Sequence, residues 1–317
     1  MSYNSKNYLK AETIEGLSLA EIYFWGFKGY FGGGLLTSSE SNEIDGIIFG
    51  PETAINPAAT LAVARWSLAG VNSSIKGYWG GGVLSGGTLS SEIDGIIFIS
   101  ETAINPAAVL SVARSGLAGV NSSSRGYFGG GYTGTVYSTK IDSLYFADET
   151  ASGLSAVLAV ARNGLAGVNS STRGYFGGGM KSLPTLTYYN EIDGIIFETN
   201  TAINPAAILS VARYFLAGVN SSSRGYFGGG YTGTHTSEID GIQFSDETAI
   251  NPAATLAVAR SGLAGVKSSI KGYWAGGSTG TTSSEIDGII FGTETATNPG
   301  VTLSVARSDL AGVQHGI

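Results

Sequence analysis

The chain has 317 residues, of which 49 are glycine and only 13% are charged, and its formal net charge is −7. We expect no nucleic-acid partner, because phosphate recognition needs a clustered cationic footprint and the 24 acids here outnumber the 17 bases. No apolar run reaches the roughly 18 residues of a membrane span, and we expect no secretory signal peptide, because residues 1–6 lack its apolar stretch. The absence of cysteine excludes disulfides and thiol catalysis.

Residues 1–27 do not share the pattern that fills the rest of the chain. Residues 1–10 are polar and suit a disordered start, whereas residues 17–27 carry a dense apolar cluster that includes Tyr23, Phe24, Trp25 and Phe27. We predict that residues 1–27 form an N-terminal arm, whose aromatic side chains dock against the rest of the chain or against a partner subunit.

From Lys28 onward, a short aromatic stretch followed by glycines recurs six times. Neighbouring rings such as Tyr30 and Phe31 would point to opposite faces of a strand. The glycines that follow permit positive φ or the close approach of another chain. Because alanine replaces the first of them in the sixth copy, the strict requirement lies on the second and third, which are Gly33 and Gly34 in the first copy. The copies begin at Gly29, Gly77, Gly126, Gly174, Gly225 and Gly272, at intervals of 48, 49, 48, 51 and 47 residues.

Three further strand-like segments complete each copy. After a variable loop comes a hydrophobic strand with an Asp, residues 43–49 in the first copy, and a turn with an Asn-Pro step follows it. The Ala-rich segment that comes next, residues 61–65, has helical propensity. It is short, however, and its other copies contain β-branched Val109 and Ile208, so we predict a third strand there. Residues 68–71, Leu-Ala-Gly-Val, form the fourth element.

Four strand-like segments in about 48 residues are typical of a β-propeller blade. The Gly-Gly after an aromatic strand, the hydrophobic strand with its Asp and the closing Arg resemble the kelch repeat over residues 28–317. That resemblance implies four-stranded blades around a central axis, although the Trp that the kelch pattern places after the second strand is absent. The repeats also resemble the kelch-like repeats of bacteriophage and environmental viral proteins.

The order of the segments predicts how the ring closes. In the kelch arrangement the Leu-Ala-Gly-Val strand is innermost, where small residues avoid overpacking around the axis. The repeats begin with an aromatic strand and end with an inner strand, so residues 310–313 should pair beside Tyr30 and remove a free sheet edge. We therefore predict an all-β, six-bladed kelch-like propeller over residues 28–317, closed by the C-terminal strand. The large rings of residues 17–27 fit the crowded axis poorly, which favours the arm.

The charged residues that recur in every copy favour a structural role. Each copy has an Asp in the hydrophobic strand and an Arg after the Ala-rich segment, as at Asp45 and Arg65. A catalytic site needs one acid and one base in different environments. We therefore expect the Asp to cap a turn or to pair with an Arg within or between blades. The Asn-Ser-Ser sequences, in which Lys267 replaces Asn in the fifth copy, match the glycosylation pattern, but turn chemistry explains their recurrence better.

Metal and catalytic chemistry have few candidate residues. The two histidines, His235 and His315, lie in separate segments, so a zinc or copper centre has too few ligands, and we expect no metal and no cofactor. The glycine runs lack the Gly-Lys-Ser/Thr of a phosphate-binding loop. No nucleophile–base pair is visible, and the Ser-x-Asp-x-Gly-x-Thr-Trp signature of six-bladed sialidases is absent. We expect a protein that is not an enzyme.

The copies differ most in the loop between the glycines and the hydrophobic strand. Because strands alternate in direction, all six loops should emerge on one face, and function on repeat scaffolds resides in such loops. Tyrosine offers a flat apolar face with a hydroxyl group, which suits sugars and protein surfaces. The alternative is that these residues only cover their own loops. The candidate binding residues, in the third to fifth copies, are Tyr132, Tyr137, Tyr188, Tyr189, Tyr231 and His235.

These features favour a non-catalytic binding or structural propeller. The viral resemblance implies a phage virion protein, associated with a tail or fibre and made in the host cytoplasm. Its expected partners are other virion or scaffold proteins and a host surface glycan or protein receptor. The alternative is a cellular lectin-like or protein-interaction propeller, secreted or cytoplasmic, and an enzyme that acts on sugars comes third.

Overall fold

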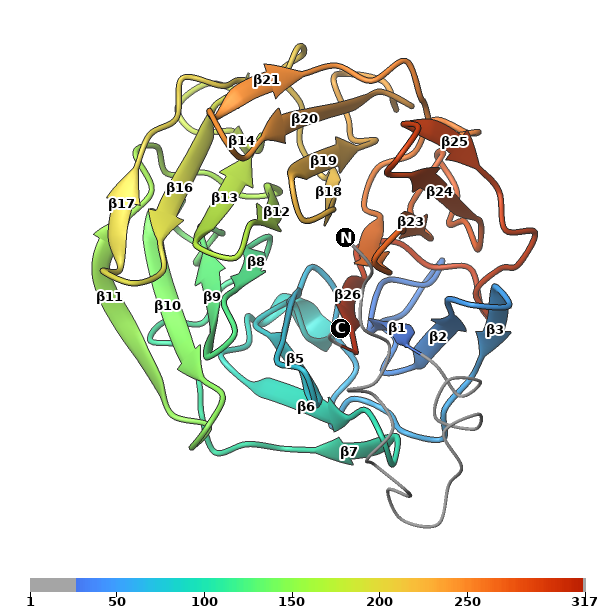
Figure 1. The fold of residues 1–317 in the computed structure, drawn as a ribbon. Coiled ribbons are helices and arrows are strands. Elements are labelled where there is room, and N and C mark those ends of the chain that lie inside the picture. Colours follow the sequence, from blue (N-terminus) through green and yellow to red (C-terminus); the bar gives the residue numbers. More distant parts are fainter. Residues whose placement is uncertain (1–26, 316–317) are drawn as a thin grey trace, which may run out of the picture.

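The computed structural model describes residues 27–315, which form a closed ring of six four-stranded antiparallel sheets (Figure 1). The predicted all-β, six-bladed propeller is therefore confirmed. Each sheet is one blade, and its strands are called inner, second, third and outer from the axis to the rim. The blades are β26 (Ala311–Gln314), β1 (Lys28–Gly32), β2 (Ile44–Ile48), β3 (Thr53–Ile55); β4 (Ala69–Asn72), β5 (Lys76–Gly80), β6 (Ile93–Ile97), β7 (Thr102–Ile104); β8 (Ala118–Asn121), β9 (Arg125–Gly129), β10 (Lys140–Tyr145), β11 (Ala151–Val157); β12 (Ala166–Asn169), β13 (Arg173–Gly177), β16 (Ile192–Ile196), β17 (Thr201–Ile203); β18 (Ala217–Asn220), β19 (Arg224–Gly228), β20 (Ile239–Gln243), β21 (Thr248–Ile250); and β22 (Ala264–Lys267), β23 (Lys271–Ala275), β24 (Ile286–Ile290), β25 (Thr295–Thr297).

The C-terminal strand closes the ring, as predicted. β26 pairs antiparallel with β1, and Tyr30 lies opposite Val313 in the register. A second closure runs around the axis, where the residue two positions before each inner strand donates its backbone N–H to the carbonyl of the equivalent residue in the preceding blade, over 2.7–2.9 Å. These residues all have positive φ, between 54° and 67°. They are Ser67, Gly116, Gly164, Phe215, Gly262 and Asp309.

The prediction of a strand in the Ala-rich segment is wrong. Residues 61–65 form bends, and the outer strand is instead β3, in the segment predicted as a turn. The segment must carry the chain from the rim back to the axis, so its backbone cannot follow the edge of the sheet. Leu61 N–H and Arg65 N–H donate to loop carbonyls at Asn42 and Ser41 instead.

The third blade shows what stops the outer strand in the other copies. It lacks the Asn-Pro step, and its outer strand β11 extends over 7 residues, compared with 3 in β3. Proline has no N–H for a sheet ladder. Where it is absent, the pairing with β10 continues past an irregularity as far as Val157.

Aromatic residues join neighbouring blades. Each tyrosine of a second strand stacks on a phenylalanine that follows the third strand of the next blade, with ring centroids 5.1–5.7 Å apart. The glycine before the tyrosine makes room for the preceding blade, because a Cβ on Gly29 would lie 2.5 Å from Val266. The recurring Gly-Tyr pair therefore encodes contact between blades as well as a strand.

Backbone geometry requires glycine at three of the recurring positions. Gly33 and Gly34 have φ values of 67° and 119°, which L-residues rarely adopt, and a Cβ on Gly33 would lie 2.6 Å from the Arg65 carbonyl. At the axis, a Cβ on Gly119 would lie 2.0 Å from the Gly70 carbonyl. Because the inner strands approach this closely, the axis admits only glycine at that position.

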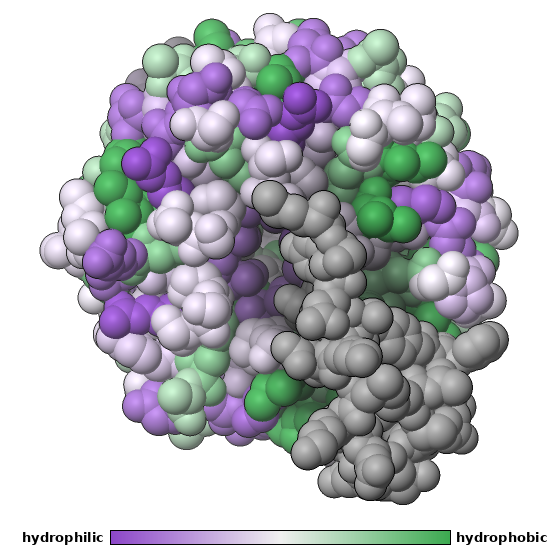
Figure 2. All heavy atoms as spheres, viewed as in Figure 1, coloured by the Kyte–Doolittle hydropathy of each residue, from purple (hydrophilic) through white to green (hydrophobic). Residues whose placement is uncertain are grey.

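The two faces of the disc differ in the connections that they carry. The loop face carries the variable loops between second and third strands and the crossovers between blades. The opposite face carries the tight turns between inner and second strands, most of them Asn-Ser-Ser, and we call it the Asn–Ser face. On this face, hydrophilic residues line a hollow near the centre of the disc (Figure 2).

Candidate functional site

A cluster of rings lies on the loop face where the fourth and fifth blades meet. Tyr214 is its centre, with Tyr188 stacked at 5.2 Å, Phe215 at 4.8 Å and Tyr231 edge-on at 5.6 Å between ring centroids. His235 continues the cluster edge-on to Tyr231 at 5.2 Å. All five side chains are half-buried, so their rings are partly accessible. We call these five residues the tyrosine patch.

Three connections position the tyrosine patch. Tyr188 comes from β15 (Thr187–Tyr188), which pairs with β14 (Met180–Lys181) in the loop of the fourth blade. Tyr214 lies in the crossover into the fifth blade, and its N–H and carbonyl pair with those of Tyr231 in that blade's loop. His235 Nδ1 lies 3.2 Å from the Ser261 hydroxyl, which ties the patch to the next crossover. Backbone pairing therefore holds the rings in place.

The other predicted binding residues lie outside the tyrosine patch. Tyr132 and Tyr137 form a separate ring pair on the third blade, 5.0 Å apart, and the Tyr137 hydroxyl lies 2.5 Å from that of Ser182. Tyr189 is half-buried, and its backbone pairs with Gly179 and Arg213. The structure thus brings together Tyr188, Tyr231 and His235 from the six predicted residues.

Sequence reasoning missed Tyr214 and Phe215, which join the predicted rings. They occupy a crossover position where other copies carry Ser115-Gly116 or Ser261-Gly262, and that departure is the signal that could have identified them. Burial first, and then the neighbouring tyrosines, raises the pKa of Tyr214, so its hydroxyl stays a neutral donor. The patch therefore offers flat apolar surface with neutral hydroxyl groups, as sugar and protein surfaces require.

The recurring Arg and Asp residues pair with each other beneath the loop face. Each Arg lies in the crossover into a blade and pairs with the Asp of that blade's third strand. Burial raises the pKa of Asp94 and lowers the pKa of Arg65, although each partner's charge opposes the shift. Each pair therefore holds a crossover against the third strand of its blade. The pairs are Arg65–Asp94, Arg114–Asp142, Arg162–Asp193, Arg213–Asp240, Arg260–Asp287 and Arg307–Asp45.

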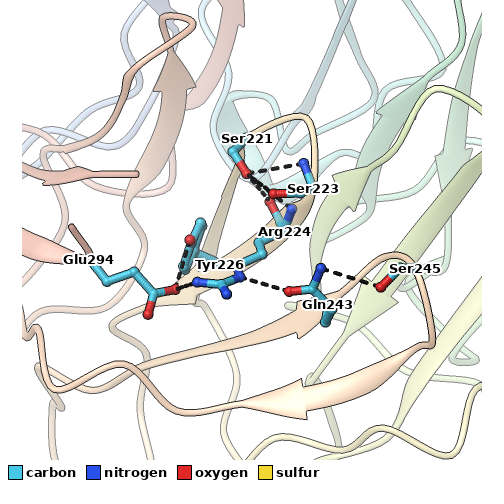
Figure 3. Close-up of polar contacts among 7 residues, drawn as sticks. All are labelled: Ser221, Ser223, Arg224, Tyr226, Gln243, Ser245 and Glu294. Carbon is cyan, nitrogen blue, oxygen red and sulfur yellow. Dashed lines mark hydrogen bonds and ion pairs between the residues drawn. The ribbon is translucent and has the colours of Figure 1, made fainter. Parts of the chain in front are cut away.

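A second group of ion pairs joins neighbouring blades near the Asn–Ser face. In Figure 3, Glu294 accepts hydrogen bonds from Arg224 at 2.7 Å and from the Tyr226 hydroxyl at 2.9 Å. The same Arg224 donates to Gln243, so one guanidinium links two blades. The other pairs of this kind in residues 27–315 are Lys28–Glu101, Lys76–Glu149, Arg173–Glu247 and Lys271–Glu52.

The predicted arm lies mostly outside the described residues. Of its aromatic residues, Tyr23, Phe24 and Trp25 are not described, whereas Phe27 is. Phe27 is 42% exposed, and its ring lies 5.6 Å from that of His315 at the end of β26. The docking prediction is therefore untested for most of its residues.

No protein-family model matches the chain, and no curated protein matches it in sequence. The kelch and viral resemblances therefore stay predictions, whereas the propeller fold is shown. Within residues 27–315, no group of three or more potential metal-ligating side chains occurs, and no helix is long and apolar enough to cross a membrane. The propeller fold fits a binding or structural role.

Proposed function

We propose that the chain is a non-catalytic propeller of a phage virion, associated with the tail or a fibre, which recognises a host surface glycan through the tyrosine patch. The patch is the observation that carries this proposal: five half-buried rings from two blades, built where the copies depart from each other. The repeats' resemblance to kelch-like viral repeats supports the virion context. The recurrent Asp and Arg residues pair with each other beneath the loop face, which supports a non-catalytic role.

A glycan array tests the ligand. The double variant Tyr214→Ser/Phe215→Gly restores residues that other copies carry at this crossover, so it should fold. We expect its binding to a glycan that the wild type captures to fall at least about tenfold, as for loss of a buried aromatic anchor. The matched control, Trp66→Ser, removes a ring from the equivalent crossover position of another blade and should bind as the wild type does.

Two outcomes would overturn the glycan proposal: no glycan captured by the wild type, or equal losses in both variants. The virion context has its own test, which is mass spectrometry of purified particles together with the genes beside the coding sequence. Absence of the protein from particles, or of capsid and tail genes nearby, would favour a cellular lectin-like or protein-interaction propeller instead.

A further inference from the structure

The axis opens on the Asn–Ser face into a pocket of about 480 Å³, a volume typical of small-molecule sites. Four Asn-Ser-Ser turns line most of it. Lys267 and Gln314, which end the other two inner strands, and His315, which follows Gln314, line the rest. Hydrophilic residues surround this hollow in Figure 2. It lies on the face opposite the tyrosine patch, so its ligand would be a separate one.

One residue gives this pocket a charge. The inner strands end in a ring of Asn72, Asn121, Asn169, Asn220, Lys267 and Gln314, in which Lys267 is the one cation. Its ammonium group has no ion pair or hydrogen bond within residues 27–315. Burial lowers the pKa of Lys267, and no carboxylate among the described residues opposes that shift.

Other lysines on this face are paired, which makes Lys267 exceptional. Lys76 lies 2.8 Å from Glu149, and Lys271 lies 2.9 Å from Glu52. Among residues 27–315, no Asp or Glu lines the pocket. Burial lowers the pKa of His315, so the ring is neutral near pH 7 and Lys267 is the one positive charge among the lining residues that the structure describes. An unpaired, partly buried charge is unfavourable, and an anion would offset that cost.

The rest of the lining offers neutral hydrogen-bonding groups. The side-chain amides of Asn72, Asn169 and Asn220 each donate to the next serine carbonyl over 3.2–3.3 Å, which fixes their orientation. The second serine of each turn, by contrast, is exposed and makes no side-chain hydrogen bond within residues 27–315. These serines are Ser74, Ser123, Ser171 and Ser222, and all four line the pocket.

We propose that the axial pocket binds an acidic sugar, with its single carboxylate on Lys267 and its hydroxyl groups on the surrounding carboxamides and serines. One ammonium group matches one carboxylate, and hydroxyls and carboxamides both donate and accept as sugar hydroxyls require. A pocket of about 480 Å³ is far larger than a bare inorganic anion needs, so charge alone would leave most of the lining unused.

Titration calorimetry with sodium glucuronate and sodium galacturonate tests the proposal. The variant Lys267→Asn restores the residue of four other copies and should preserve the turn. We expect the wild type to bind at least one uronate and Lys267→Asn to bind it at least about tenfold more weakly, because loss of a partly buried charge partner costs that much or more. Lys267→Arg should retain part of the affinity. Glucose, acetate and inorganic phosphate, as neutral and charged controls, should bind more weakly than the uronate.

A thermal melt without ligand gives a second readout. Because Lys267 is an unpaired charge, Lys267→Asn should melt at the same or a higher temperature than the wild type, and a clearly lower one would indicate a structural role and overturn the proposal. Three results of the calorimetry would also overturn the proposal. These are equal uronate binding by Lys267→Asn and the wild type, no binding of either uronate by the wild type, and binding of phosphate or acetate as tight as that of the uronate. The variant Tyr214→Ser/Phe215→Gly should keep uronate binding, which separates this site from the tyrosine patch.

Discussion

The propeller has two groups of ion pairs that differ in burial and in what they join. Beneath the loop face, the Arg–Asp pairs lie within a blade, and their side chains are 0% exposed for Arg and 1–4% for Asp. Near the Asn–Ser face, the Lys/Arg–Glu pairs join neighbouring blades and are 12–39% exposed on the basic side and 22–28% on the acidic side. The recurring charged residues therefore have two structural roles: the buried pairs stabilise single blades, and the partly exposed pairs join neighbouring blades.

The difference explains where the copies are free to vary. A fully buried pair cannot lose one member without stranding a charge, and all six copies keep both Arg and Asp. A half-exposed pair contributes little, and the junction between the third and fourth blades has Asn200 in place of Glu. The loops above the buried Arg–Asp pairs can therefore differ in length from copy to copy. The turns of the Asn–Ser face tolerate single substitutions, such as Lys267 in place of Asn.

Opening the ring should have the largest effect, because both groups of pairs depend on closure. Deletion of residues 310–317 removes the whole of β26 and exposes the edge of β1. We expect aggregation, or a fall in melting temperature large enough to abolish the native transition, in thermal melts and size-exclusion chromatography. The double substitution Leu183→Ser/Leu186→Ser, at an exposed loop tip, is the control and should melt close to the wild type. A native melt after the C-terminal deletion would mean that another segment supplies the inner strand.

Breaking one pair from each group tests the comparison directly. Arg162→Met strands Asp193 in the core and leaves the Gly178 and Phe176 carbonyls without their donor, so we expect a loss of about 3–5 kcal/mol in the free energy of unfolding. Arg224→Met, near the Asn–Ser face, should cost about 1 kcal/mol or less. Urea denaturation measures both. Replacing both members, Arg162→Met/Asp193→Leu, should recover much of the loss, and equal losses in the two single variants would contradict the distinction.

Alkaline pH should weaken the contacts around the Lys/Arg–Glu pairs near the Asn–Ser face, because it ionises tyrosines that donate hydrogen bonds to the same Glu residues. Burial, and then the hydrogen bond to Glu247 or Glu294, raises the pKa of Tyr175 and of Tyr226 to about 12, from an ordinary value of 10.0. A raised pKa means that the folded state holds the proton more tightly. The resulting stabilisation is complete below pH 10 and is lost as the pH rises to about 12. Melting temperature against pH, together with tyrosinate absorbance, should show this fall, and Glu247→Gln should move the Tyr175 titration to lower pH.

The architecture could be predicted from sequence because it depends on repetition. The period of the repeat predicts the length of one blade, and the number of copies predicts the number of blades. The order of the segments predicts that residues 310–313 close the ring. The Ala-rich segment misled the prediction because it is short and its other copies contain β-branched Val109 and Ile208, as a strand would. Its hydrogen-bond partners belong to a loop, and residue pattern does not show where a backbone group finds its partner.

The candidate sites were harder to predict because they combine different copies. Tyr188 and Tyr231 were found in variable loops, but the ring that joins them, Tyr214, lies in a segment that is otherwise regular. Lys267 was visible as an exchange within the Asn-Ser-Ser turns. Its chemistry depends on six strand ends meeting around one axis without an acid among them, and no single copy contains that information.

Restoring the missing pair should have the smallest effect. At the exceptional junction the Tyr127 hydroxyl donates to Asn200 over 3.0 Å, and Arg125 lies 3.9 Å above the Tyr145 ring. Asn200→Glu/Tyr145→Ile installs the acid that the other junctions carry and frees Arg125 to reach it. We expect a gain of no more than about 0.5 kcal/mol in urea denaturation, because an exposed pair gains little and Glu fits the positive φ of 52° less well than Asn does. A gain above about 2 kcal/mol would exceed the range of exposed pairs and would place both groups of ion pairs in one energetic class.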